Sequence, residues 1–211
     1  MKIVLINENS QAAKNELVFN TLKKVVEPKG HTVYNIGMFG SEDKSLTYVQ
    51  NGILAAVLLN SGAADFVITG CGTGSGAMLA CNAFPGVNCG LIVDPSDAYM
   101  FAQINDGNCA SFPFAKGFGW GAELNLEYCF EQLFKGEKGQ GYPAERREPE
   151  QRNKKILDQV KLSTFKPLTE SLKEIDRELV KGALDRPSFK DYFNANCKDD
   201  TLKACVEEIL A

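Results

Sequence analysis

The stretch DFVITGCGTGSGAM, residues 65–78, joins a short β-rich segment to a loop with glycine at every second position. The aromatic and β-branched residues of 65–70 predict a buried strand, and the glycines after it predict a tight turn into a helix. One cysteine, Cys71, lies inside this turn. Alternating glycines let a backbone approach a ligand closely, so we expect the thiol to lie close to that ligand too.

The pattern of strand followed by helix repeats over the first 135 residues. Short apolar segments predict strands at 2–6, 32–37, 65–70, 88–93 and 109–114. Helical patterns cover 12–30, 45–63, a short segment after 76, 95–104 and 119–134. This alternation predicts an α/β fold, a Rossmann-like α/β/α sandwich with a five-stranded parallel sheet. Ligands bind such sheets at the carboxyl ends of the strands, an edge that residues 7–11, 70–76, 94–97 and 115–119 are expected to share.

The composition changes near residue 141, because only one of the 19 glycines, Gly182, lies beyond Gly141. A polar connector over 137–155 leads into helical patterns at 150–165, 167–184 and 199–210. We therefore predict an α/β domain over 1–141, followed over 142–211 by a linker and a C-terminal helical extension. The apolar spacing in the extension favours packing on the sheet domain or on a partner chain.

Composition also excludes several classes of function. A net charge of -4 without a basic stripe argues against nucleic acid as a partner. The most apolar stretch, 52–64, is too short to span a membrane, and the N-terminal residues do not resemble a signal peptide, so a cytoplasmic protein is expected.

Cysteine and histidine usage limits the chemistry further. The seven cysteines are odd in number and contain no C-x-x-C pair, so we expect no disulfide framework and no metal site, and most of the thiols should be buried apolar residues. The single histidine, His31, makes a Cys-His or Ser-His-Asp mechanism improbable.

Three interpretations of the glycine loop compete. A phosphate-binding Walker loop is excluded because no lysine follows the glycines. A dinucleotide fingerprint fits Gly72–Ala77, with Asp94 placed for a ribose, and favours an NAD-dependent oxidoreductase, although this motif follows the third strand instead of the first. The third interpretation is an anion cradle of backbone N–H groups beside a thiol with a lowered pKa. It suits proton abstraction next to a carbonyl, where one such donor is worth ~10²–10³ in rate.

Three motifs in order resemble the family of ribose-5-phosphate isomerase B and galactose-6-phosphate isomerase. They are the Gly-Cys-Gly-Thr-Gly-x-Gly loop at 70–76, CNAFPG at 81–86 and NDGN at 105–108. The resemblance implies the same sandwich fold and a homodimer or homotetramer with the active site at the subunit interface. It also implies a metal- and nucleotide-free interconversion of aldose and ketose phosphates through a cis-enediolate.

The resemblance also implies roles for individual residues. Cys71 is implied as the base, with Thr73 and the backbone of Gly72, Gly74, Ser75 and Gly76 stabilising the enediolate, and Asn105 binding sugar oxygens. Phosphate is expected to bind Lys116, Arg152 and either Arg146 or Arg147.

Two departures from the family concern histidines. The ring-opening histidine before Asn-Asp is Ile104 here, and the Asp-His after the first strand is replaced by Asn7 and Glu8. One explanation is that Glu8 opens the sugar ring and Asn7 binds the substrate. The other is that the substrate is already open-chain. A tetrose phosphate meets this condition, whereas a pentose phosphate forms a ring. A sugar-phosphate sensor without catalysis is a further alternative.

Other polar residues near the expected edge have structural explanations. Asp94 and Asp97 are expected to cap a helix, and Asp106 to brace the loop of Asn105. The only tryptophan, Trp120, is expected in the core or an interface.

Overall fold

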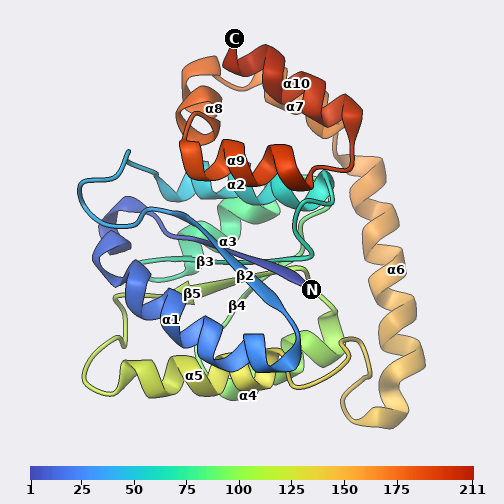
Figure 1. Ribbon diagram of the computed structural model, residues 1–211. Coiled ribbons are helices and arrows are strands. Elements are labelled where there is room, and N and C mark those ends of the chain that lie inside the picture. Colours follow the sequence, from blue (N-terminus) through green and yellow to red (C-terminus); the bar gives the residue numbers. More distant parts are fainter.

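A computed structural model, which describes all 211 residues, contains a five-stranded parallel sheet in the order β2-β1-β3-β5-β4 (Figure 1). The order places β3 at the centre of the sheet, and every residue of β3 is buried. The strands are β1 (Lys2–Ile6), β2 (Thr32–Gly37), β3 (Phe66–Cys71), β4 (Cys89–Leu91) and β5 (Cys109–Pro113). The α/β class, the parallel sheet and its five strands are confirmed. The chain order reverses between β1 and β3, which is where ligands bind in such sheets.

Alternating residues of each strand face two separate hydrophobic layers. Ile3 and Leu5 pack with α1 (Asn15–Val26), α4 (Pro95–Met100) and α5 (Ala122–Leu133). Val4 and Ile6 pack on the opposite face with α2 (Tyr48–Asn60) and α3 (Ser75–Asn82). The period of two in the sequence therefore builds both sides of the sandwich.

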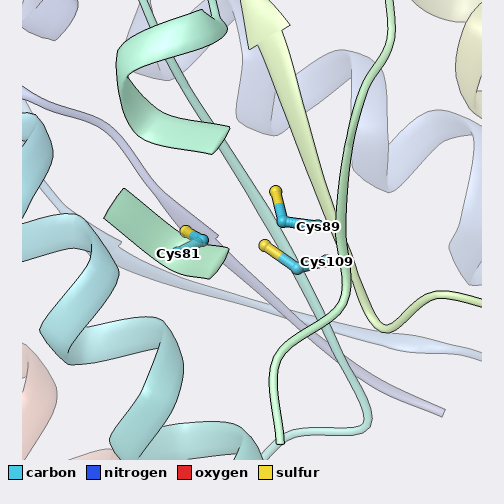
Figure 2. Close-up of side chains that lie close together, drawn as sticks. All are labelled: Cys81, Cys89 and Cys109. Atoms are coloured by element: carbon cyan, nitrogen blue, oxygen red, sulfur yellow. The ribbon is translucent and has the colours of Figure 1, made fainter. Parts of the chain in front are cut away.

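The cysteines are all free, and six of the seven are buried, as their spacing predicted. Three of them, Cys81, Cys89 and Cys109, lie close together on the α2 and α3 side of the sheet (Figure 2).

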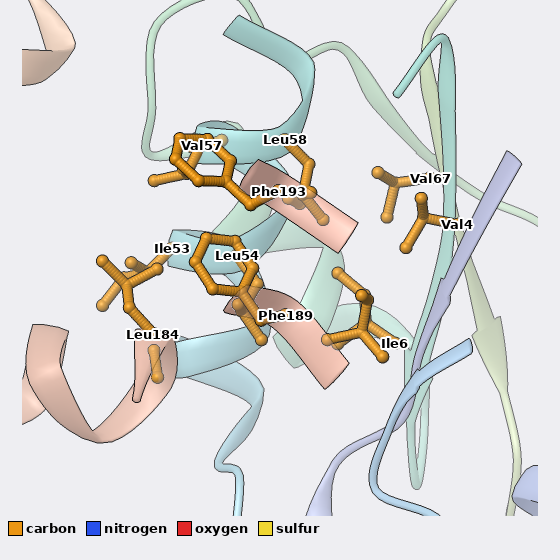
Figure 3. Packing of buried hydrophobic residues seen from close by; sticks show 14 of the residues in the cluster. Val4, Ile6, Ile53, Leu54, Val57, Leu58, Val67, Leu184, Phe189 and Phe193 are labelled. Carbon is orange, nitrogen blue, oxygen red and sulfur yellow. The ribbon is translucent and has the colours of Figure 1, made fainter. Parts of the chain in front are cut away.

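The C-terminal helices form an additional layer over α2 (Figure 1). These helices are α7 (Leu168–Glu174), α8 (Arg177–Leu184), α9 (Pro187–Asn196) and α10 (Asp200–Leu210). Phe189 and Phe193 on α9 pack beside Leu54 and Leu58 of α2 (Figure 3). Extension and sheet thus share one hydrophobic core, which confirms packing on the sheet domain, while the boundary at 141 stays an interpretation.

Two helix predictions in the extension are wrong. The pattern over 167–184 is interrupted at Ile175, because Asp176 accepts a hydrogen bond from the Leu179 N–H and caps a second helix there. Residues 187–196, for which we predicted no helix, form α9 with a proline at its first position.

The remaining long helix, α6 (Arg147–Thr164), lies beside the sheet and has no buried residue (Figure 1). Four shorter helical segments connect the larger elements: η1 (Asn9–Lys14), η2 (Glu27–Lys29), η3 (Phe101–Asn105) and η4 (Ala144–Arg146). None of the helices combines the length and apolarity needed to cross a bilayer.

Candidate active site

The loop after β3 has a backbone path that only glycine permits at two positions. A Cβ atom on Gly70 would lie 2.4 Å from the Phe112 carbonyl oxygen. Gly74 has φ +77°, and a Cβ atom there would lie 2.5 Å from Leu91. The alternating glycines therefore let the loop pass directly against β5.

The backbone N–H groups of this loop are unpaired. None of the six N–H groups from Gly72 to Ala77 donates a hydrogen bond within the protein. Helix α3 begins in this loop, and its N-cap Gly74 has no side chain that could accept from the first helical N–H groups. Unpaired N–H groups at a helix N-terminus attract negative charge, and the loop over residues 72–77 is called the cradle below.

Neighbouring backbone holds the cradle in place. The Phe114 N–H donates to the Cys71 carbonyl at 2.9 Å, and the Lys116 N–H donates to the Gly72 carbonyl at 2.8 Å. On the other side of the loop, the Ser111 hydroxyl donates to the Gly74 carbonyl at 2.7 Å. The carbonyls are thus engaged while the N–H groups stay free.

Cys71 is the last residue of β3 and lies where the cradle begins. Its thiol is free and 8% exposed, whereas Thr73 is exposed and its hydroxyl makes no hydrogen bond within the protein. Ser75 and Gly76, in the first turn of α3, are half-buried. The structure therefore brings together the predicted thiol, hydroxyls and backbone donors at one edge.

The loop after β1 lies at the same edge, and both of its predicted site residues have partners. The Glu8 carboxylate is nearly buried and accepts from the N–H and hydroxyl of Ser10, at 2.8 and 2.5 Å, which caps η1. The Asn7 side chain is fully buried, donates to the Gln11 carbonyl and accepts from Asn15. These contacts position residues 7–11 beside the cradle.

Three residues at this edge were not among the predicted site residues, although one of them, Gln11, lies in the segment 7–11 that was expected here. Gln11 faces the loop, since a Cβ atom on Gly72 would lie 3.9 Å from its Nε2, and the Tyr48 ring would lie 3.4 Å from a Cβ on Gly76. The Lys14 ammonium donates to Gln11 and to the Phe114 carbonyl, and burial lowers the pKa of Lys14. Their only sequence signal is position, directly after the first strand or at the start of a helix.

Asn105 and the predicted arginines lie at the opposite edge of the sheet. Asn105 is exposed and lines a cavity of about 200 Å³ with residues of α6. The segment after it pairs with the start of β3, since the Val67 N–H donates to the Asn108 carbonyl. Val67 and Cys71 are four residues apart on one strand, a separation of ~13 Å. Asn105 and Cys71 therefore do not meet within one chain.

The arginines of α6 share this distant edge. Asp158 of α6 accepts from Asn88, and Lys161 donates to the Val87 carbonyl, both just before β4 begins. Arg146, Arg147 and Arg152 are exposed on η4 and α6, whereas Lys116 is exposed at the edge of Cys71.

Three aspartates near the expected edge, Asp94, Asp97 and Asp106, all have hydrogen-bond or ion-pair partners within the protein. Asp94 caps α4 by accepting from the hydroxyl and N–H of Ser96 and the N–H of Asp97, and the Ser96 hydroxyl is the main cause that lowers the pKa of Asp94. Asp106 pairs with Lys138 at 3.2 Å, and Asp97 accepts from the Val93 N–H.

The tryptophan prediction needs a correction. Trp120 is fully exposed in the glycine-flanked loop after β5, so it does not pack in the core of the chain, and only the interface alternative stays open.

Comparison with known proteins places these features in a family. Residues 3–134 match the model of the Ribose/Galactose Isomerase family, and residues 163–209 match a second model described as Ribose-5-phosphate isomerase. No curated protein matches the chain.

Two solved structures match over the full length, the helical extension included. A 4-deoxy-L-threo-5-hexosulose-uronate ketol-isomerase complexed with a tartrate is 58% identical, with a TM-score of 0.97 over 100% of this chain and 99% of that one. A ribose-5-phosphate isomerase from Vibrio parahaemolyticus is 50% identical, with a TM-score of 0.98 and the same coverage.

A shorter relative shares the fold alone. The type B ribose 5-phosphate isomerase from Trypanosoma cruzi is 17% identical, with a TM-score of 0.64 over 77% of this chain and 99% of that one. The family match covers more than half of the chain, and both full-length relatives are sugar isomerases. The chain therefore belongs to the ribose/galactose isomerase family and is an aldose–ketose isomerase.

Proposed function

We propose that this enzyme isomerises an open-chain, acidic sugar through a cis-enediolate, with Cys71 as the base. The observation that carries the proposal is the row of unpaired N–H groups from Gly72 to Ala77 directly after the thiol. A developing enediolate oxygen is an anion, and fixed donors that meet it stabilise the transition state more than the substrate. No metal or nucleotide takes part in this reaction as we propose it.

The proposed reaction moves one proton between neighbouring carbons. The Cys71 thiolate removes the proton from the hydroxyl-bearing carbon next to the aldehyde. The C–H electrons form the enediolate double bond, and the carbonyl π electrons move to its oxygen, which accepts from the cradle N–H groups. The Cys71 thiol then returns the proton to the former aldehyde carbon, while the hydroxyl proton moves to the former aldehyde oxygen. Thr73 and Ser75 supply hydroxyls to the sugar oxygens.

The substrate that we favour is a 4-deoxy-5-hexosulose-uronate, the compound that the 58% identical relative is named for. Its name describes a chain with no hydroxyl at carbon 4 and a ketone at carbon 5, so the groups that close the usual sugar rings on the aldehyde are absent. Ile104 stands where the family resemblance implies a ring-opening histidine. A substrate without that ring needs no such histidine. Glu8, whose carboxylate accepts from the N–H and hydroxyl of Ser10, then has no ring to open.

A sugar phosphate is the second candidate, supported by the 50% identical ribose-5-phosphate isomerase. A tetrose phosphate and a pentose phosphate both end in an anion that the exposed Lys116 or an arginine can bind. A uronate ends in a carboxylate and a sugar phosphate ends in a phosphate. The two terminal groups differ in shape and charge, so the cation that binds them must be placed differently.

We further propose that the active site is completed by a second copy of the chain in a homodimer or homotetramer. Asn105, Arg147 and Arg152 lie at the edge opposite Cys71, so the expected sugar and anion contacts require another subunit to supply them. Exposed apolar residues on α6, namely Ile156, Leu157 and Val160, support an interface along this helix.

A substrate panel tests the proposal. Turnover of the 4-deoxy-hexosulose-uronate, ribose 5-phosphate and erythrose 4-phosphate is measured under identical conditions, together with binding of each. We expect the highest kcat/KM for the uronate. Equal or better turnover of ribose 5-phosphate contradicts the open-chain proposal, and tight binding without turnover of any member identifies a sensor.

A further inference from the structure

Three buried thiols converge beside helix α3, where β4 and β5 begin. Cys81 lies in α3, Cys89 begins β4 and Cys109 begins β5 (Figure 2). Cys89 and Cys109 are direct partners in the parallel ladder, and the three sulfur atoms all lie within 4.8 Å of one another. The three cysteines come from three separate elements of the fold, so the sequence contains no C-x-x-C motif that would indicate the cluster.

The surroundings of the three thiols are apolar. Cys81 and Cys109 are completely buried, Cys89 is 8% exposed, and all three belong to the core formed with Val67 and Val87. A cation from outside the cluster, the Lys161 ammonium of α6, lies near Cys89 and donates to the Val87 carbonyl. A buried site of this kind disfavours any ligand that leaves a net charge behind.

The thiols also interact with one another. Cys109 and Cys89 lower the pKa of the neighbouring Cys81 thiol, whereas burial and the Cys81 sulfur raise the pKa of Cys109 well above its ordinary value. The thiolate is the form that binds metals, so each thiol gives up its proton when its sulfur becomes a ligand.

We propose that Cys81, Cys89 and Cys109 form a binding site for a trivalent thiophilic ion, As(III) supplied as arsenite. The site offers three sulfur ligands, whereas structural zinc sites need four. Three thiolates around As(III) give a neutral complex, whereas Cu(I) with the same ligands would leave a charge of about −2 in the core. As(III) binds three sulfurs in a pyramid, so bonds of about 2.3 Å place the sulfurs roughly 3.5 Å from one another, and a pair separated by 4.8 Å must close by about 1.3 Å.

The binding step balances without any change of oxidation state. Arsenous acid, As(OH)₃, exchanges its three As–O bonds for three As–S bonds. The three thiol protons leave with the three hydroxide groups as three water molecules, and each sulfur becomes a ligand.

The site is connected to the catalytic loop through one short helix. Helix α3 is eight residues long, begins at Ser75 in the cradle and carries Cys81 in its last turn. The helix is wedged against α2, because a Cβ atom on Gly52 would lie 2.6 Å from the Ala80 carbonyl oxygen. Drawing Cys81 toward β4 and β5 shifts the cradle N–H groups, so As(III) should inhibit isomerisation. This consequence for activity rests on the proposed function, whereas the binding itself does not.

Arsenite titration of the full chain tests the site. The Cys71→Ala variant is used for binding, so that the catalytic thiol does not contribute. We expect one equivalent of As(III) by calorimetry and three sulfur neighbours by X-ray absorption. Cys81→Ser and Cys109→Ser should each weaken binding at least ~100-fold, because two thiolates cannot complete the complex. Cys129→Ser, a buried thiol on the other face of the sheet, should bind like its parent.

The X-ray absorption measurement needs no substitution in the cluster, so a misfolded serine variant does not obscure the answer. No stoichiometric binding, fewer than three sulfur neighbours, or unchanged affinity in the two serine variants overturns the site. If binding is as expected but no panel sugar is turned over, the site stands and the proposed function falls.

Discussion

The loop after β3 and the helical layer over α2 differ in how many of their groups are left free. The loop exposes unpaired N–H groups, whereas the layer buries its side chains. In the loop, six consecutive N–H groups have no partner and glycines replace side chains. In the layer over α2, Phe189 and Phe193 are fully buried, and even Arg186 is buried with its guanidinium donating to the Ile36 and Lys44 carbonyls. The first region leaves binding groups free for a ligand, and the second leaves almost none free. Substitutions should therefore affect rate in one region and stability in the other.

The largest effect is expected for Cys71→Ala. Loss of the base should reduce kcat by ~10²–10⁴ with the best sugar of the panel, because the proton transfer then lacks its acceptor. The melting temperature should stay close to that of the unmodified chain, since the thiol makes no hydrogen bond. Steady-state kinetics and calorimetry measure the two effects, and Cys197→Ala, a free thiol far along the chain, is the control. Full activity of Cys71→Ala removes the thiol from the mechanism.

The opposite behaviour is expected for Phe193→Ala. Removing a buried aromatic ring between α9 and α2 should lower the free energy of unfolding by ~3–5 kcal/mol. The kcat of the folded enzyme should be unchanged, because this ring does not lie at the edge of Cys71. Urea denaturation and kinetics at low temperature measure both, with Leu162→Ala on exposed α6 as the control. A fall in kcat without a loss of stability would break the separation of the two regions.

Gly74→Ala is expected to fall between these two cases. Alanine at φ +77° costs ~1–2 kcal/mol, and its methyl would also meet Leu91 and the backbone of β5. Stability and kcat should both fall, because the strained position is also the N-cap of α3. Gly76→Ala is the matched control, since its methyl would make only ordinary contact with Tyr48 at 3.4 Å. Equal effects of the two variants on stability would contradict the backbone argument.

The smallest effect concerns His31, which is remote from both regions. Burial, with the charges of the N-terminal ammonium and of Lys29 adding to it, lowers the pKa of His31 below 6.5. The unfolded chain therefore binds more protons than the folded chain between the lowered pKa and 6.5, and stability should rise with pH across this window. Chemical denaturation at several pH values measures the slope, which His31→Gln should reduce. An unchanged slope in the variant assigns the dependence to other groups.

The sequence predicts the sheet and the catalytic edge because both depend on local patterns. Period-two apolar strands and the glycines of 70–76 determine where a strand ends and a backbone is exposed, and the structure agrees. Helix α9 was not predicted, because its apolar residues lie in a short and otherwise polar segment. Packing of Phe189, Tyr192 and Phe193 on the core formed with α2 stabilises this helix.

The rest of the site depends on contacts between segments that are distant in sequence. Lys14 donates to the Phe114 carbonyl, 100 residues further along the chain, and three cysteines from α3, β4 and β5 meet where β4 and β5 begin. The spacing of these residues in the sequence does not predict such contacts. The separation of Asn105 from Cys71 also follows only from the direction of the strands.

Deuterium uptake from solvent tests the central claim most directly. The enzyme is incubated in D₂O with the 4-deoxy-hexosulose-uronate, and proton NMR follows the carbon next to the carbonyl. We predict incorporation of one deuteron at the carbon that receives the proton, in the unmodified chain and in Cys197→Ala but not in Cys71→Ala. Isomerisation without any deuterium, or exchange that persists in Cys71→Ala, would contradict an enediolate whose proton is carried by Cys71.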